Sequence, residues 1–400
     1  MDTTAIEFYE QRLAIARDAK HGDRRGEGNV LGNLGLAYAD LGDARRAIEY
    51  HEQALPIFRE IGDRRGEGNA LGNLGIAYAD LGDARRAIEF YEQHLVIARE
   101  IGDRQGESNA LGNLGIAYAD LGDARRAIEF YEQHLVIARE IGDRRGEGNA
   151  LMNTGNAYHS LGDARNAIKY HEQALPIFRE IGDRRGEGQD LGNLGLAYAD
   201  LGETRRAIEF YEQDLVIARE IGDRRGEGAA LGNLGAAYAA LGDARRAIEF
   251  YEQALAVMHD IGDKRAAGQI LGNLGAACAA LGDARRAIEY HEQRLAIARE
   301  IGDRRGEGNA LVNLGSAYFT LGEYQGATSY YEEQRAIAQE IGDCHGEANA
   351  LWGLAICFES AKDTPRAITH AEAALEIFTA IESPSAQTMR NLLAKWRGEK

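Results

Sequence analysis

Residues that could act in catalysis are few, and they form no recognisable catalytic or metal-binding pattern. The three cysteines, Cys278, Cys344 and Cys357, are unevenly spaced and match neither a disulfide framework nor a zinc site. Cys344 lies next to His345 in a segment expected to be a turn, and we interpret it as a lone exposed thiol. No acid–base pair, nucleophile arrangement, phosphate-binding loop or zinc-protease motif stands out. The sequence therefore predicts a protein that is not an enzyme and that holds no metal ion and no cofactor.

The glycine-rich segment GEGNALGNLG and the histidines have structural explanations. The segment superficially resembles a dinucleotide-binding loop, but no strand precedes it, its spacing is wrong and it recurs along most of the chain. His51, His171 and His291 occupy a position that elsewhere holds tyrosine, which indicates a packing role. His94 and His134 hold the same place in two consecutive copies of a repeated segment, and we do not expect a metal between them.

Asparagine is the residue type whose placement best suits binding. It recurs once in most copies of the repeated segment at each of two positions, and one helical turn separates the two positions, which puts both on one face of a helix. Because an amide both donates and accepts hydrogen bonds, it can pair with a peptide backbone whatever side chains the peptide carries. The candidate groove residues of this Asn29 row and Asn33 row are Asn29, Asn33, Asn69, Asn73, Asn109, Asn113, Asn149, Asn153, Asn193, Asn233, Asn273 and Asn313. The alternative is that these amides bridge adjacent repeats, or only copy one ancestral repeat.

Glycine often precedes the second asparagine, at Gly32, Gly72, Gly112, Gly192, Gly232 and Gly272. A glycine inside a helix costs about 1 kcal/mol relative to alanine. Its repetition at this position suggests that something approaches the backbone closely, either a ligand or the neighbouring helix.

Two further sets of residues are candidates for the groove. Arginines near the helix starts could clamp carboxylates, although arginine is also common on any solvated helix. This set comprises Arg65, Arg145, Arg185 and Arg225. Side-chain specificity would lie where the groove departs from the repeat, at Asn156, His159 and Phe319, and drift explains these departures equally well.

The elements that position these residues follow from a strict internal repeat. A Gly-Asp pair recurs at constant spacing, at 22–23, 62–63, 102–103, 142–143, 182–183, 222–223, 262–263, 302–303 and 342–343. In the first repeat, Leu31, Leu34 and Tyr38 recur at helical spacing. Gly42 then suits the left-handed end of that helix, and Asp43 suits the cap of the next. Each repeat is therefore predicted to be two helices, and no strand pattern is present.

The pattern Leu31-x-x-Leu34-Gly35-x-x-Tyr38, followed by Ala47, resembles the signature of the tetratricopeptide repeat family, with Leu in place of the usual Trp. The period alone would also suit HEAT or armadillo repeats. The length and amino-acid sequence of the repeats are most similar to those of the long-repeat subclass, found in the spindle-orientation adaptor called Pins or LGN and in kinesin light chain. The resemblance implies an all-α, right-handed α-solenoid whose first helices line a concave face and bind an extended peptide.

The domain boundaries follow the same period. Residues 1–22 are predicted to be a half repeat with only the second helix, residues 23–382 nine repeats, and residues 383–400 a capping helix. The lone first helix has two explanations: the chain was clipped from a larger protein, or one helix suffices as a cap. End-to-end stacking through that helix is a weaker possibility.

Charge and composition limit the partners. Among 400 residues, 64 Asp and Glu outnumber 46 Lys and Arg, so the formal charge is −18. This balance argues against nucleic acid or an anionic membrane as the main partner. Both signs are mixed along the chain, which indicates a solvated charged surface. With no signal peptide, no apolar run long enough to span a membrane and cysteines that suit a reducing compartment, the expected location is cytoplasmic.

These observations favour a non-catalytic scaffold that binds an extended segment of a partner protein and is itself a monomer. One alternative is a sensor or regulatory array detached from a larger signalling protein, such as a nucleotide-dependent switch ATPase or a caspase-like protease. Another is a self-assembling structural unit.

Overall fold

The computed structural model describes residues 3–18 and 23–398, and within these ranges every regular element is an α-helix. The chain divides into an N-terminal unit, Met1–Glu203, and a C-terminal unit, Thr204–Lys400. The helices of the N-terminal unit are α1 (Thr3–Arg17), α2 (Arg24–Asp40), α3 (Ala44–Glu60), α4 (Arg64–Asp80), α5 (Ala84–Ile101), α6 (Arg104–Asp120), α7 (Ala124–Ile141), α8 (Arg144–Ser160), α9 (Ala164–Glu180) and α10 (Arg184–Asp200). Those of the C-terminal unit are α11 (Thr204–Glu220), α12 (Arg224–Ala240), α13 (Ala244–Asp260), α14 (Lys264–Ala280), α15 (Ala284–Ile301), α16 (Arg304–Thr320), α17 (Tyr324–Ile341), α18 (Cys344–Ser360), α19 (Thr364–Ala380) and α20 (Ser385–Arg397).

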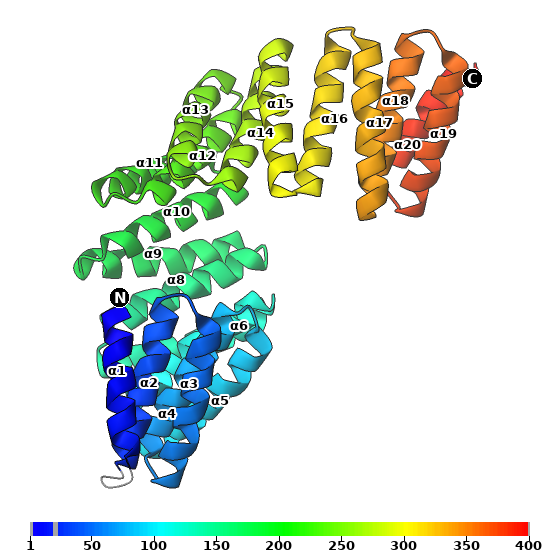
Figure 1. Ribbon diagram of the computed structural model, residues 1–400. Coiled ribbons are helices and arrows are strands. Elements are labelled where there is room, and N and C mark those ends of the chain that lie inside the picture. Colours follow the sequence, from blue (N-terminus) through cyan, green and yellow to red (C-terminus); the bar gives the residue numbers. More distant parts are fainter. Residues whose placement is uncertain (1–2, 19–22, 399–400) are drawn as a thin grey trace. The chain divides into compact units, whose positions relative to one another are not determined.

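From α2 to α19 the helices come in pairs, one pair to each repeat of the sequence. We call the first helix of a pair helix A (even numbers) and the second helix B (odd numbers). Within each unit, every helix packs against the helix before it and the helix after it, as Figure 1 shows. Neighbouring A helices such as α2 and α4 also touch. The predicted all-α solenoid of helix pairs is confirmed. Parts of the predicted end segments, at 1–2, 19–22 and 399–400, lie outside the described residues.

The turns have the chemistry that the sequence predicts. Gly42 has a φ of +77°, and the Asp43 side chain accepts a hydrogen bond from the backbone N–H of Arg46 at 3.1 Å. The next turn repeats this arrangement, since Gly62 has a φ of +68° and Asp63 accepts from the N–H of Gly66 at 2.9 Å. A left-handed glycine thus ends one helix and an aspartate caps the next.

The core lies between the helices of each pair and between neighbouring pairs. Leu31 and Leu34 of helix A are fully buried. The ring of His51, on helix B of the same pair, lies over Gly35, where a Cβ atom would meet the ring. Tyr38 stacks on Tyr50 with their ring centroids 5.3 Å apart. Glycine at position 35 therefore makes room for the aromatic ring of helix B.

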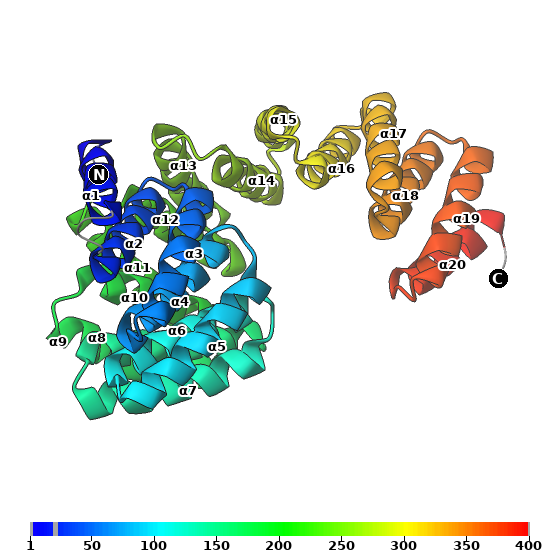
Figure 2. The same ribbon diagram turned by 60° about the horizontal axis from the view of Figure 1, so that its bottom comes forward.

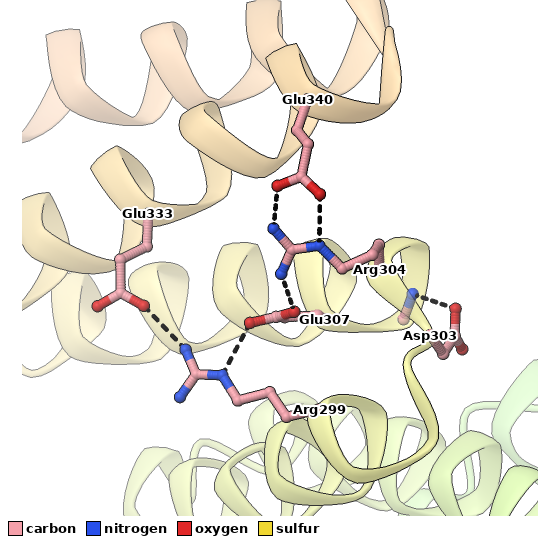
Figure 3. Close-up of polar contacts among 7 residues, drawn as sticks. Arg299, Asp303, Arg304, Glu307, Glu333 and Glu340 are labelled. Carbon is pink, nitrogen blue, oxygen red and sulfur yellow. Dashed lines mark hydrogen bonds and ion pairs between the residues drawn. The ribbon is translucent and has the colours of Figure 1, made fainter.

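One row of glutamates on the A helices is buried, although the sequence predicts that the charged residues are solvated along the whole chain. In Figure 3, Glu307 of α16 accepts a hydrogen bond from Nε of Arg299 at 2.7 Å and also pairs with Arg304. Arg304 in turn pairs with Glu340 of α17, and these carboxylates hold the pKa of Arg304 above its usual range. The Glu307 side chain is only 6% exposed. This Arg–Glu ladder therefore joins three consecutive helices.

The ladder recurs through most repeats, is interrupted in the repeat of α14, and is altered in the repeat of α18, where Gln339 and Cys344 replace its two arginines. The equivalent buried glutamates are Glu27, Glu67, Glu107, Glu147, Glu187 and Glu227. In α14 the position holds Ala267, and the preceding arginine is replaced by His259. The prediction of a solvated charged surface was wrong for these glutamates. Their burial depends on how one repeat packs on the next, and the sequence of a single repeat does not show that packing.

Candidate functional site

A cavity of about 660 Å³ in the N-terminal unit brings together six of the predicted asparagines. Its lining comes from the A helices α4, α6 and α8 and from the B helices α5 and α7, which follow one another in the stack seen in Figure 2. The lining residues are Asn69, Gly72, Asn73, Ile76, His94, Asn109, Gly112, Asn113, Ile116, His134, Asn149, Met152 and Asn153. We call this surface the Asn groove.

Helical spacing explains why the amides face the groove. Leu71 and Leu74 of α4 are fully buried in the core, so the residues beside them on the opposite face of the helix point outward. Asn69 and Asn73 are one turn apart on that outward face. The same register repeats in α6 and α8, because these helices begin and end at the positions of the repeat at which α4 does.

The amides of the Asn33 row are free of hydrogen bonds to the described part of the chain. Within the described residues, the side chains of Asn73, Asn113 and Asn153 make no hydrogen bond to any other residue. In the Asn29 row, Asn109 Oδ1 accepts a hydrogen bond from Gln105 Nε2 at 3.2 Å, one turn away on the same helix. The alternative in which the Asn33 row bridges adjacent repeats therefore has no hydrogen bond to support it.

Two histidines, which sequence reasoning set aside, line the groove beneath the amides. The ring of His94 lies across α4, where a Cβ atom on Gly72 would be 2.9 Å from its Nδ1 atom. His134 lies over Gly112 in the same way, at 3.1 Å. Burial lowers the pKa of both imidazoles, which favours their neutral form. In these two repeats a neighbouring helix explains the glycine. The signal in the sequence was the pairing of this glycine on helix A with a large side chain on helix B of the same repeat.

Exposed aliphatic side chains complete the groove. Ile76 is 43% exposed and Ile116 is 46% exposed, and both line the cavity. Leu36 and Leu196 hold the equivalent positions on α2 and α10 and are 46% and 39% exposed. The groove thus offers amides for hydrogen bonds and aliphatic surface for apolar side chains.

The remaining predicted asparagines lie elsewhere. Asn29 and Asn33 are exposed on α2, and Asn193 is half-buried on α10, outside the lining of the cavity. Asn233, Asn273 and Asn313 lie on α12, α14 and α16 of the C-terminal unit.

The predicted arginines mostly pair with carboxylates of the chain itself. Arg65 lies 3.7 Å from Asp103, and Arg145 lies 3.5 Å from Asp183. Both aspartates cap the A helix of the next repeat. Arg225 contacts Asp263 in the same way at 3.1 Å, and Arg185 is exposed. A ligand carboxylate would have to compete with these internal ion pairs.

The residues predicted to give specificity do not line the Asn groove. His159 Nε2 lies 2.8 Å from Asp200 Oδ2. Asn156 is exposed on α8, and Phe319 packs at a tilt against Tyr324 with their ring centroids 5.5 Å apart. No two of these three residues are brought together by an interaction between them.

Metal-binding clusters and membrane-spanning helices are both absent from the described part of the chain. No three His, Cys, Asp or Glu side chains gather there as a metal ion would require. No described helix is both long and apolar enough to cross a membrane.

Several solved structures are similar to this chain in fold. A Signal Transduction ATPase with Numerous Domains protein with a tetratricopeptide repeat sensor, from Pyrococcus horikoshii, matches 95% of the chain with a TM-score of 0.71 and 18% identity. The match covers 56% of that protein, so this chain spans little more than half its length. The apo form of the quorum sensor NprR from B. thuringiensis matches with a TM-score of 0.55 and 16% identity, covering 91% of this chain and 99% of that one.

A third structure is a Rap protein complexed with competence and sporulation factor. It has a TM-score of 0.53 and 17% identity, and the match covers 93% of this chain and 98% of the other. No curated protein matches the sequence. The tetratricopeptide repeat family matches residues 3–60, 66–140, 146–220, 191–259, 226–300 and 306–380. With helix pairs, capped turns and a family match that runs along most of its length, the chain belongs to the tetratricopeptide repeat family.

Proposed function

We propose that this protein is a non-catalytic binding scaffold that holds an extended segment of a partner protein in the Asn groove. The observation that carries the proposal is the set of unpartnered amides at Asn73, Asn113 and Asn153, which line one cavity on three consecutive repeats. An extended peptide presents N–H and C=O groups at regular intervals along its length. An amide that is free on the protein side can satisfy either group.

The composition of the groove supports this ligand class over a small molecule. The cavity is a long surface shared by five helices, and its polar groups are amides that bind backbone without selecting side chains. Ile76 and Ile116 supply apolar area, and burying it against a ligand is favourable by about 25 cal/mol for each Å². Shape and chemistry therefore suit a polypeptide better than a compact charged metabolite.

The similar structures agree with a role in protein interaction or regulation. One is a Rap protein complexed with competence and sporulation factor, and another is a quorum sensor. A second candidate function is a sensor array within a larger signalling protein, favoured by the likeness to the ATPase with a tetratricopeptide repeat sensor. In either case the Asn groove is the surface on which the partner binds.

The proposal extends to the setting of the protein. A net charge of −18 disfavours binding to nucleic acid or to an anionic membrane surface. Cys278 and Cys357 are buried free thiols, in keeping with a reducing compartment such as the cytoplasm. We infer a monomer, and light scattering of the purified chain distinguishes it from the self-assembling alternative.

The test is a selection from a display library of random linear peptides on the full chain. Selected peptides are then measured against the triple variant N73A/N113A/N153A. Loss of three hydrogen bonds of about 0.5–1.5 kcal/mol each predicts binding that is weaker by about tenfold or more.

The matched control is the triple variant Q93A/Q133A/Q173A. These glutamines also hold one position of three consecutive repeats, but they are exposed on helix B and donate to their own helix, as Gln93 Nε2 does to the Glu89 carbonyl oxygen at 3.1 Å. The control should bind the peptides as the wild type does. Equal affinity of the asparagine variant, or equal loss in both variants, contradicts the proposal.

A further inference from the structure

One position on helix B varies in chemistry while most of the repeat stays constant. In α5, α7 and α15 its side chain lies against helix A of the same pair, so we call the members of this position the floor row. From α3 to α17 the row comprises Ala54, His94, His134, Ala174, Asp214, Ala254, Arg294 and Gln334. Its members line cavities in both units. His94 and His134 line the Asn groove, and Gln334 lines a cavity of about 110 Å³ with Asn309 and Asn349.

Floor-row side chains lie across helix A where that helix has glycine. The guanidinium carbon of Arg294 is 2.9 Å from the place where a Cβ atom on Gly272 would be, as the imidazoles are in the Asn groove. Where the floor residue is Ala254, the Cβ position on Gly232 has no atom within 4 Å. The repeat between Asp214 and Arg294 therefore leaves open space above its A helix.

The two charged members of the row have no hydrogen-bond or ion-pair partner in the described part of the chain. Neither Asp214 nor Arg294 makes an ion pair or hydrogen bond within the described residues, although both side chains are half-buried. Arginines of the ladder, such as Arg299, pair with carboxylates at 2.7 to 3.0 Å. Taking a charge partly out of water without a partner is unfavourable, so each is suited to a ligand of opposite charge.

The fold does not need these charges. Alanine holds the position in four repeats, at Ala54, Ala174, Ala254 and Ala374. The helices that carry these alanines begin at an aspartate cap, as α5 and α7 do, and differ from those two in length by a single residue. Burial also lowers the pKa of Arg294 and raises the pKa of Asp214 to about 7, so a counter-charge from a ligand would relieve both.

We propose that the floor row selects the ligand, and that in the C-terminal unit Asp214 and Arg294 bind a basic and an acidic side chain of one extended peptide. This inference rests on the proposed function, because it uses the same mode of binding. The amides of Asn233 and Asn273, on the A helices between the two charges, hold the backbone of that peptide. The open space above Gly232 receives an intervening side chain.

The spacing of the two charges sets the length of the segment. Asp214 and Arg294 are two repeats apart, on α11 and α15. Packed helices lie about 8–10 Å apart, and the A helices of successive repeats touch, so two repeats along the layer of A helices span roughly 20 Å. About six residues of extended peptide, at about 3.3 Å each, cover that distance.

The experiment uses fluorescence anisotropy with synthetic peptides that are blocked at both ends, so that termini carry no charge. Two probes place one Lys and one Glu about six residues apart in opposite orders. Two further probes carry Gln in both places or Lys in both places. We expect one of the two mixed orders to bind the full chain about tenfold or more tighter than the Gln probe, since charge-assisted hydrogen bonds add to its affinity.

Variants of the full chain assign the preference. Asp214→Ala and Arg294→Ala should each remove most of the preference for one mixed probe. Both variants introduce the residue that the row already has in four repeats. The swapped variant D214R/R294D should prefer the opposite order. The control variants are Arg245→Ala and Glu249→Ala, which remove one positive and one negative charge from exposed positions of α13 outside the floor row. Both should prefer the same mixed probe as the wild type.

Each other outcome has a definite meaning. If all four probes bind equally well, peptides bind but the floor row does not select them, so this inference is wrong while the proposed function stands. If the swapped variant keeps the wild-type order, the inference is also wrong. If no probe binds, the inference is overturned, and the display selection on the Asn groove decides the proposed function separately.

Discussion

Replacing Glu307 by alanine tests whether the Arg–Glu ladder holds consecutive repeats together. The change removes a side chain that is 6% exposed and bonded to two arginines, Arg299 and Arg304 (Figure 3). It also reproduces in α16 the residue that α14 has at the same position, Ala267. The helix itself should persist, because alanine is the strongest helix former.

The structure sets the size of the effect. Two hydrogen bonds to charged groups contribute about 1.5–3 kcal/mol each when they are well buried. The two arginines are 50% and 39% exposed, and each keeps a second carboxylate, Glu333 or Glu340. Because both cations stay solvated and paired after the change, we expect a loss of about 2 kcal/mol.

The assay is hydrogen–deuterium exchange of the full chain, read by mass spectrometry. In a repeat array each repeat contacts only its neighbours, so the loss should appear as local opening. Exchange in α15, α16 and α17 should accelerate by about 30-fold, which corresponds to about 2 kcal/mol. The control is Glu333→Ala, which removes an ion pair whose side chains are both 50% exposed and should change exchange by less than about fivefold. Unchanged exchange in α15 to α17, or equal acceleration in α2 to α5, would refute the reasoning.

Four further variants test other parts of the structure. Burial raises the pKa of Asp214 from 3.8 to about 7, so the folded wild type loses stability as the pH rises through that range. The free energy of unfolding of Asp214→Ala, measured with urea, should therefore rise by about 1–3 kcal/mol relative to wild type between pH 4 and pH 7. Above pH 7 the difference should stay constant. Gly232→Ala should stabilise by about 1 kcal/mol because its Cβ meets no atom within 4 Å, whereas Gly75→Ala should lose about 1–3 kcal/mol against the tyrosine ring above it; thermal unfolding that ranks them in reverse contradicts the packing. The buried pair His171–Asp190, with Nδ1 and Oδ1 2.7 Å apart and the second carboxyl oxygen unpartnered, should be replaceable by H171Y/D190A with a gain of about 1–4 kcal/mol; a lower melting temperature would show that the pair stabilises the fold.

Much of the fold could be predicted because each element has a local cause. Gly42 and Asp43 mark a helix end and a helix start from residue chemistry alone, and the structure shows the left-handed φ and the side-chain cap. Leu31 and Leu34 are fully buried, as their spacing predicts. These features repeat, so one correct repeat gives nearly all of the helices.

Contacts between repeats could not be predicted in the same way. Arg65 contacts Asp103 of the next repeat, and Glu67 is buried by Arg59 of the preceding helix and Arg64 of its own. Such contacts depend on how one repeat is placed on the next, which sequence spacing within a repeat does not reveal. The charged residues were therefore expected on a solvated surface, and part of them form the ladder.

The candidate groove shows the same division. Helical spacing puts Asn69 and Asn73 on one outward face, and the structure places both in the Asn groove. The floor row was not predicted, because only the packed helix pair shows that His94 lies against Gly72 and Arg294 against Gly272. Knowledge of the packed pair is needed before those side chains can be assigned.

The most direct test of the central claim follows the amide side chains themselves. A sample labelled with nitrogen-15 only at asparagine shows the side-chain NH₂ signals, and N73A, N113A and N153A assign three of them. Addition of a peptide selected on the wild-type chain should shift these three signals, because their amides acquire hydrogen-bond partners that the described residues do not give them. If the peptide binds and all three signals stay in place, the amides do not hold the peptide and the account is wrong.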